Sequence, residues 1–197
     1  TLIDRVAAAK QMDLIADFAL PLPTIVITDL LGIPAADREL VADWSQAIIA
    51  PGRHGLTFSA RKRKVRAFVA YLQELFAERQ RQPEDDLISA LVGAEEGGER
   101  LNPAELSSMV ALLLVTGHET TVNLIGNGVL ALLRHPDQLA RVKAGDEKGV
   151  ETAVEELLRF DGPVETSTTR WVRRDVVYKG CLMRRGDVVR VVLASAN

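Results

Sequence analysis

The feature that most restricts the fold of this sequence is a long stretch without proline. After Asn102-Pro103-Ala104-Glu105, the next proline is Pro136. Asn102 can cap a helix, Pro103 suits its first turn, and Glu105 stands where a capping box needs an acidic side chain. The sequence therefore predicts a helix of about thirty residues, on the order of 48 Å long at 1.5 Å per residue.

Apolar side chains lie on nearly every face of this predicted helix. Every residue from 109 to 115 is apolar, so we expect the helix to run through the hydrophobic core. The apolar run ends at Thr116 and is about half as long as a bilayer span requires. We therefore expect no membrane span.

A polar segment, Thr-Gly-His-Glu-Thr-Thr at residues 116–121, interrupts this helix near its middle. A glycine costs a helix about 1 kcal/mol relative to alanine, and a buried carboxylate without a partner costs more. Polar residues that contradict the local pattern tend to mark functional sites. The alternative interpretation is a packing glycine beside a solvated Glu119 and a solvated His118.

The spacing within this segment predicts a site on one helix face. Thr116, Gly117 and Thr120 are three or four residues apart and share that face. Gly117 leaves room for a bulky, flat partner, and the hydroxyl of Thr120 or Thr121 can bond back to a carbonyl one turn earlier. A small groove beside a hydroxyl and the Glu119 acid suits the binding and protonation of a ligand.

Helical periodicity also dominates the rest of the chain up to about residue 163. Further helices are predicted over residues 2–9, 21–31, 35–49, 59–81 and 85–92, from Pro136 onward, and over 150–160. Segments rich in β-branched residues at 166–172, 176–179 and 188–193 then predict short strands. The predicted fold is mostly α, with a long central helix and a small antiparallel β element near the C-terminal end.

Two shorter motifs follow the long helix. Glu156 and Arg159 are three residues apart and can pair on one helix face. Because the apolar Leu157 and Leu158 lie between them, we expect this pair to be buried. Arg170 lies in a β-like stretch, and its guanidinium suits bidentate binding of a carboxylate.

Charge and cysteine content bear on partners and compartment. The chain has 24 basic and 27 acidic residues and a net charge of -3, so there is no general reason to expect nucleic acid or an anionic membrane as a partner. The densest basic run, residues 61–66, opens a predicted helix and is interpreted as a solvated face. The single cysteine, Cys181, cannot form an intrachain disulfide, and we expect a cytoplasmic protein.

In this order, the motifs resemble those of the bacterial cytochrome P450 family of haem-thiolate monooxygenases. Residues 117–121 resemble the family's oxygen-activation motif of a Gly, any residue, an acid and a Thr. Glu156 and Arg159 match its Glu-x-x-Arg pair, and residues 180–189 resemble its Gly, hydrophobic, basic, Gly-Asp hairpin. Residues 13–34 and 134–139 are also similar to bacterial members, so the resemblance covers essentially all 197 residues.

The resemblance implies a monooxygenase that inserts one oxygen atom from dioxygen into a small organic substrate. Glu119 and Thr120 would be catalytic and deliver protons. Thr116, Gly117 and Thr120 would contact haem b, and Arg170 would hold a haem propionate. Electrons would come from a ferredoxin or flavodoxin-type donor, because the chain has no dinucleotide-binding glycine motif.

The sequence departs from the family pattern in two respects. Thr116 stands where the family usually has Ala or Gly, and the larger side chain is expected to narrow the oxygen-side pocket. Residues 1–197 are expected to be a partial domain, without the upstream part and without the loop that carries the axial Cys, expected after Asn197. Cys181 lacks the glycine-rich context of that ligand. We therefore expect no metal ligand within this chain, and no activity from these residues alone.

One alternative of a different class stays open at this point. A non-catalytic helical ligand-binding or scaffold module has a similar composition, although it would not need the spacings at residues 117–120 and between Glu156 and Arg159. The three histidines do not cluster with carboxylates in the way that metal ligands do. His54 lies in a predicted loop between two helices, at residues 51–55, and is expected to be exposed.

Overall fold

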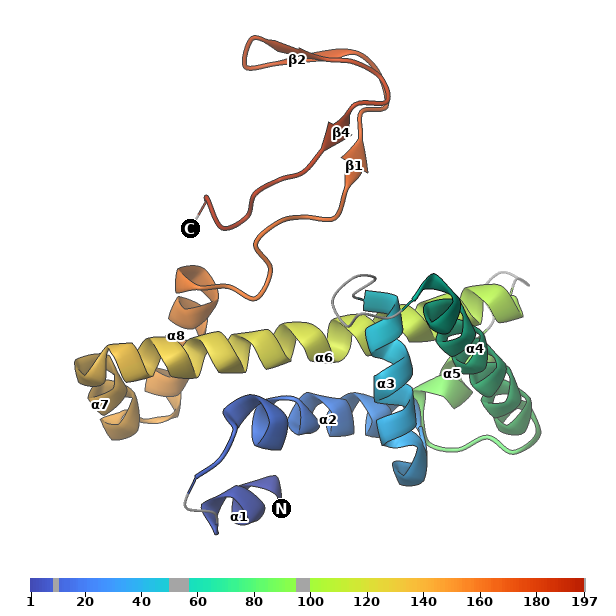
Figure 1. The fold of residues 1–197 in the computed structure, drawn as a ribbon, viewed down its shortest axis with the longest axis horizontal. Coiled ribbons are helices and arrows are strands. Elements are labelled where there is room, and N and C mark those ends of the chain that lie inside the picture. The colour runs from blue at the N-terminus through green and yellow to red at the C-terminus, as the bar shows by residue number, and fades with distance from the viewer. Residues whose placement is uncertain (9–10, 50–56, 95–99, 197) are drawn as a thin grey trace. The chain divides into compact units, whose positions relative to one another are not determined.

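The computed structural model describes residues 1–8, 11–49, 57–94 and 100–196 (Figure 1). The predicted break around His54 lies outside the described residues. Contacts divide the chain into two compact units, Thr1–Val122 and Asn123–Asn197. Each unit is described by itself.

The first unit is helical. In chain order it holds α1 (Leu2–Ala7), the π-helical turn η1 (Ile15–Ala19), α2 (Pro21–Leu31), the 3-10 turn η2 (Ala35–Asp37), α3 (Arg38–Ile49), α4 (Phe58–Arg81), α5 (Leu87–Gly93) and the first part of α6 (Pro103–Arg134). The predicted helices are confirmed, with boundaries shifted by a few residues. The π-helical turn was not predicted.

Local side-chain and backbone bonds explain where the main helices begin and end. Asn102 Oδ1 accepts from the backbone N–H of Glu105 at 3.1 Å, and Glu105 Oε2 accepts from the backbone N–H of Asn102 at 2.9 Å. This capping box starts α6, which is 32 residues long, and the predicted long helix is confirmed. Gly32 ends α2 in the left-handed region, with φ 75°, where a residue without Cβ is favoured.

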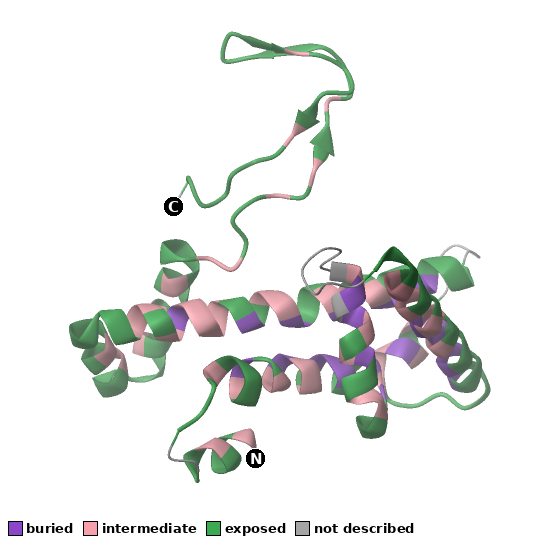
Figure 2. Cartoon of the chain, in the orientation of Figure 1, coloured by how far each residue is buried: buried purple, intermediate pink, exposed green. Residues whose placement is uncertain are grey.

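The hydrophobic core of the first unit lies where α2, α3, α4, α5 and α6 meet (Figure 2). Its largest fully buried apolar side chains are Phe68, Leu31, Leu72, Ile88, Leu114, Val41 and Val110. One face of α6 enters this core through Leu106, Val110 and Leu114, which are spaced four residues apart. This spacing gives α6 a single buried stripe.

The opposite face of α6 is exposed, which corrects the expectation that the helix runs wholly through the core. The exposed fractions of Met109 and Leu112 are 38% and 56%. Helices α2 to α5 cover only one side of α6, so its second apolar stripe has no cover among the described residues. By length and composition alone, α6 is also apolar enough to cross a membrane, a test that the core helix of a soluble protein passes as well.

The second unit begins with the end of α6 and continues into α7 (Pro136–Ala144) and α8 (Glu147–Phe160). Asp146 caps α8, because its Oδ1 accepts from the backbone N–H of Gly149 at 3.0 Å. This cap starts α8 three residues earlier than predicted. Gly128 of α6 lies against Leu157 of α8, where an added Cβ would meet the leucine Cδ1 at 3.0 Å.

Four short strands follow α8: β1 (Arg170–Trp171), β2 (Val176–Tyr178), β3 (Cys181–Met183) and β4 (Val188–Val189). They form two antiparallel pairs, β1 with β4 and β2 with β3. A tight turn at Lys179 and Gly180, both with positive φ, joins β2 to β3. The predicted antiparallel element is confirmed, although the strands are shorter than predicted. Strand β3 lies within residues 180–189, which resemble the family hairpin, but was not predicted as a strand from its residues.

Candidate functional site

The polar segment of α6 carries two hydroxyls that bond back along the helix. The Thr116 hydroxyl donates to the Leu112 carbonyl oxygen at 2.8 Å, and the Thr120 hydroxyl donates to the Thr116 carbonyl oxygen at 3.0 Å. The bonding expected for Thr120 is therefore present. Each hydroxyl oxygen keeps its lone pairs, so Thr120 can accept a hydrogen bond from water while it stays in place.

These two threonines extend the exposed apolar stripe of α6. Met109, Leu112, Thr116 and Thr120 follow one another at spacings of three or four residues and so share a face. The buried side chains Val110, Leu114 and His118 lie on the opposite face. We call the four exposed or half-buried residues the α6 stripe. The polar segment of the sequence predicted the two threonines of this stripe. Met109 and Leu112 were not predicted, because an all-apolar run does not show which side of the helix is covered.

Gly117 allows α2 to approach α6 closely. A Cβ on Gly117 would lie 2.9 Å from Cδ1 of Ile27, well inside ordinary contact distance. The close partner observed at this glycine is therefore a side chain of the same unit. Contact of Gly117 with a haem remains a prediction.

His118 and Glu119 differ in their surroundings. His118 is 2% exposed, and its Nδ1 donates to the Leu114 carbonyl oxygen at 2.6 Å. The alternative in which His118 is solvated is therefore wrong, because its ring is buried and bonded to the backbone of its own helix. Glu119 is half-buried, and its carboxylate has no hydrogen-bond or ion-pair partner within the described ranges. No described side chain holds this carboxylate in place.

Glu156 and Arg159 form a bidentate ion pair on α8. Arg159 donates through Nε to Glu156 Oε2 at 2.7 Å and through Nη2 to Glu156 Oε1 at 2.6 Å. The hydrogen bond from Arg159 lowers the pKa of Glu156. The expected pairing is present. The expected burial is not found, because the two side chains are 57% and 53% exposed.

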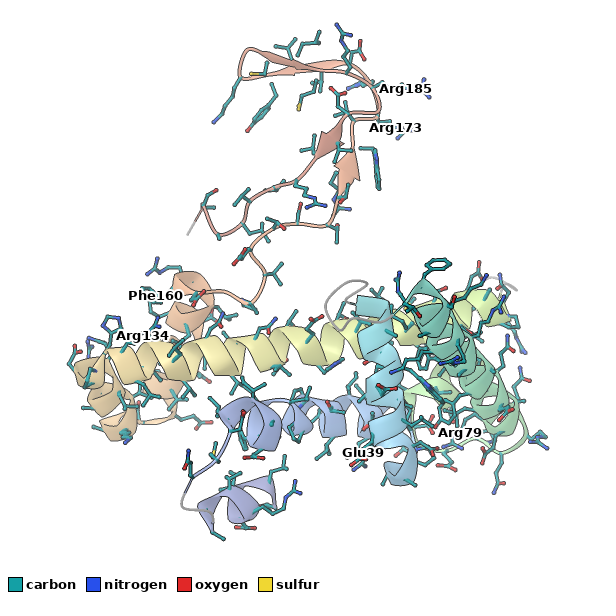
Figure 3. The ribbon with its side chains drawn as sticks, viewed as in Figure 1. Glu39, Arg79, Arg134, Phe160, Arg173 and Arg185 are labelled. Atoms are coloured by element: carbon teal, nitrogen blue, oxygen red, sulfur yellow. The ribbon has the colours of Figure 1, made fainter. Side chains whose placement is uncertain are left out.

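Arg170 lies in β1, opposite Val189 of β4. Its side chain is exposed, and its guanidinium has no hydrogen-bond or ion-pair partner in the part of the chain that the structure describes. Arg170 can therefore bind an incoming carboxylate without first breaking an internal pair. Figure 3 shows Arg173 and Arg185 together at the bend of the same β segment.

The structure places the predicted residues in separate groups. Thr116, Gly117, Glu119 and Thr120 lie together on α6 in the first unit, whereas the ion pair of α8 and Arg170 belong to the second. A groove of about 620 Å³ lies between the end of α6, α7 and α8, but none of the predicted haem contacts lines it. Cys181 is an exposed free thiol. Within the described ranges, no group of three or more His, Cys, Asp and Glu side chains is placed to hold a metal ion.

Comparison with known proteins identifies the family. The sequence model of the family described as cytochrome P450 matches residues 43–145. The chain belongs to the cytochrome P450 family. The matched range includes the α6 stripe, so the cytochrome P450 match covers the helix on which the predicted catalytic residues lie.

Several bacterial cytochromes P450 resemble the whole of this chain. The polyketide biosynthesis cytochrome P450 PksS of Bacillus subtilis is 43% identical over 198 residues, which are 100% of this chain and 48% of that protein. The cytochrome P450 monooxygenase PikC of Streptomyces venezuelae is 43% identical over 199 residues, again 100% of this chain but 47% of that protein. The chain thus spans about half the length of the curated relatives it matches.

Solved structures of cytochromes P450 share the fold. The structure of PksS from Bacillus subtilis matches with a TM-score of 0.91 and 41% sequence identity. The match covers 99% of this chain and 50% of the PksS chain. P450BioI, solved in complex with hexadec-9Z-enoic acid ligated acyl carrier protein, matches with a TM-score of 0.88 and 37% identity. This match covers 99% of this chain and 51% of the P450BioI chain. The predicted fold class and the predicted family are confirmed.

Proposed function

We propose that the full-length protein is a haem-dependent monooxygenase that inserts one oxygen atom from dioxygen into an apolar organic substrate. The observation that carries this proposal is the α6 stripe, in which two hydroxyls continue an exposed apolar surface. A flat apolar group with polar chemistry at its centre would fit such a surface. The alternative of a non-catalytic helical module gives no reason for an acid and a hydroxyl at that point.

Each unit, taken by itself, carries one feature that a haem b would use. Met109 and Leu112 offer exposed apolar surface, 38% and 56% of each residue, against which a porphyrin would bury area. In the second unit, the guanidinium of Arg170 has no partner among the described residues, and it would bind a propionate through bidentate, charge-assisted hydrogen bonds. When bound, the haem would supply the redox chemistry that activates dioxygen.

Thr120 and Glu119 would deliver protons in this reaction. The Thr120 hydroxyl, held by the Thr116 carbonyl oxygen at 3.0 Å, would position a water through its free lone pairs. Glu119, half-buried and without a partner among the described residues, would pass protons from solvent to that water. A positioned acid of this kind typically contributes about 10²–10⁴-fold to a rate.

The remaining partners follow from the family. We propose a ferredoxin or flavodoxin-type protein as the electron donor and the cytoplasm as the compartment. One relative is named for polyketide biosynthesis, and one solved structure is a complex with hexadec-9Z-enoic acid ligated acyl carrier protein. The substrate class that we propose is therefore an acyl chain carried on an acyl carrier protein.

The absorption spectrum of the full-length protein tests the proposed activity. Reduced protein under carbon monoxide should show the red-shifted Soret band of a thiolate-ligated haem, because the thiolate donates electron density to the iron. A protein that retains no haem, or whose Soret band is that of a histidine-ligated haem, would exclude the proposed function.

A further inference from the structure

The first turns of α4 carry five basic side chains, and three of them make no hydrogen bond or ion pair within the described residues. Residues 61–66 read Arg-Lys-Arg-Lys-Val-Arg. Arg61 donates to the Ala47 carbonyl oxygen at 2.8 Å, and Lys64 pairs with Asp43 at 2.6 Å. These two side chains tie α4 to α3. Lys62, Arg63 and Arg66 are exposed and have no partner in the described ranges.

The three unpaired cations lie on one face of α4, away from α3. Lys62 and Arg66 are four residues apart, and Arg63 and Arg66 are three apart, so their side chains are neighbours. Phe58 lies four residues before Lys62 and is 77% exposed. In Figure 2, the ribbon at the start of α4 is coloured mainly as exposed. We call Phe58, Lys62, Arg63 and Arg66 the α4 basic face.

Helix stability does not explain this face. The N-terminus of a helix carries a partial positive charge, so anionic side chains stabilise it and cations destabilise it. The first turn of α4 nevertheless has no acidic residue, and the cations follow at once. A local arrangement that lowers helix stability tends to serve binding. Exposed aromatic rings and arginines are also residue types that concentrate binding energy at protein interfaces.

From this face, and resting on the proposed function, we infer that α4 docks the acidic carrier protein that presents the acyl substrate. Acidic side chains of the carrier would meet Lys62, Arg63 and Arg66, while Phe58 would supply apolar contact at the edge. The charges are complementary, which favours a fast and selective encounter.

Two other anionic partners fit less well. A nucleic acid is usually held by many phosphate contacts, whereas this face offers three free cations on a chain of net charge -3. A membrane-bound helix inserts a broad apolar face. The apolar face of α4 is instead buried in the core through Phe68, Leu72 and Leu75. Within the α4 basic face, Phe58 is the single apolar side chain that could insert into a membrane.

The test measures binding of the full-length, haem-loaded protein to hexadec-9Z-enoyl acyl carrier protein over a range of salt concentrations. Wild-type affinity should fall as salt rises, because salt screens exposed charges. The Lys62→Glu/Arg63→Glu/Arg66→Glu variant should bind on the order of tenfold more weakly or worse at low salt and lose most of its salt dependence. Phe58→Ser should weaken binding but keep the salt dependence.

A matched variant, Arg134→Glu/Lys143→Glu/Lys148→Glu, makes the same change in net charge at exposed positions of the second unit and should bind as wild type. Equal losses in both triple variants, no binding by wild type, or tighter binding to duplex DNA or to phosphatidylglycerol vesicles would each overturn the inference. The readout is separate from catalysis. A protein without the thiolate Soret band that still binds the carrier through α4 would refute the proposed activity only.

Discussion

Arg79 and Asp86 form a buried ion pair that holds three helices of the first unit together. Arg79 Nε donates to Asp86 Oδ2 at 2.7 Å, and the two side chains are 5% and 4% exposed. Arg79 Nη2 also donates to the Gly32 carbonyl oxygen at 3.0 Å, just after α2. Asp86 in turn caps α5, accepting from the backbone N–H of Ser89 at 2.6 Å. The pair thus links α2, α4 and α5, near the Arg79 label in Figure 3.

Loss of Arg79 should strongly destabilise this unit. Removing one partner of a buried ion pair leaves an uncompensated charge and typically costs about 3–5 kcal/mol. We therefore expect Arg79→Ala to lower the free energy of unfolding by about that amount, measured by urea denaturation of the full-length protein. Arg81→Ala, two residues on and exposed, serves as the control and should change it little. Similar values for the two variants would show that the pair is not structurally important.

The same pair makes stability depend on pH in acid. Burial by itself raises the pKa of Asp86, but hydrogen bonds from Ser89 and Arg79 outweigh it, and the net pKa is below its ordinary value of 3.8. A carboxylate whose pKa is depressed by folding contributes stability above its unfolded pKa, and that contribution is lost as pH falls through the folded pKa.

The free energy of unfolding should therefore decrease as the pH is lowered from about 5 to about 3. Asp86→Asn removes the titrating group, so its unfolding free energy should be lower at neutral pH but should decline less steeply in acid. A decline as steep as that of wild type would assign the acid sensitivity to other carboxylates.

Arg170 is predicted to retain the haem. Arg170→Leu removes the guanidinium proposed to bind a propionate. Haem should therefore dissociate faster from the variant than from wild type, measured as the rate of haem transfer to apomyoglobin. Arg173→Leu and Arg174→Leu remove exposed arginines three and four residues further on, without that role. Equal haem loss in all three variants would remove the reason for choosing Arg170.

Glu119 is predicted to limit the supply of protons. Glu119→Gln keeps the size of the side chain but cannot exchange a proton as an acid, so turnover should slow by about 10²–10⁴-fold. Haem content and substrate binding should stay as in wild type, as checked by the absorption spectrum. A solvent isotope effect on turnover should increase in the variant if proton delivery has become rate-limiting. Unchanged turnover would assign the relay to another group.

The helix boundaries could be predicted because local chemistry sets them. Asn102 and Glu105 cap the start of α6, and Gly32 takes the left-handed conformation that ends α2. These interactions join residues that are close in sequence. The pairing of Glu156 with Arg159 was predictable for the same reason, since a spacing of three residues fixes their common face.

Burial and long-range contacts could not be predicted in the same way. The Glu156–Arg159 pair is exposed in this chain. Its burial depends on what covers that face of α8, and the local spacing does not reveal this. The contact of Arg79 with the Gly32 carbonyl oxygen joins residues 47 positions apart. An arginine near the end of a helix is ordinary in a sequence, so nothing marked Arg79 as buried. The exposure of Met109 and Leu112 on α6 could not be predicted either, because the sequence does not show which side of the helix other elements cover.

The central claim is that Thr120 delivers protons during oxygen activation, and its hydroxyl is held ready by the bond to Thr116. The most direct measurement determines product, hydrogen peroxide and consumed reductant together in the full-length Thr120→Ala enzyme. The variant should still bind haem and substrate and still consume reductant, but less of the reductant should appear as product and more as peroxide. Wild-type coupling in Thr120→Ala would contradict the claim and would assign proton delivery to another group, such as Thr121 or a hydroxyl of the substrate.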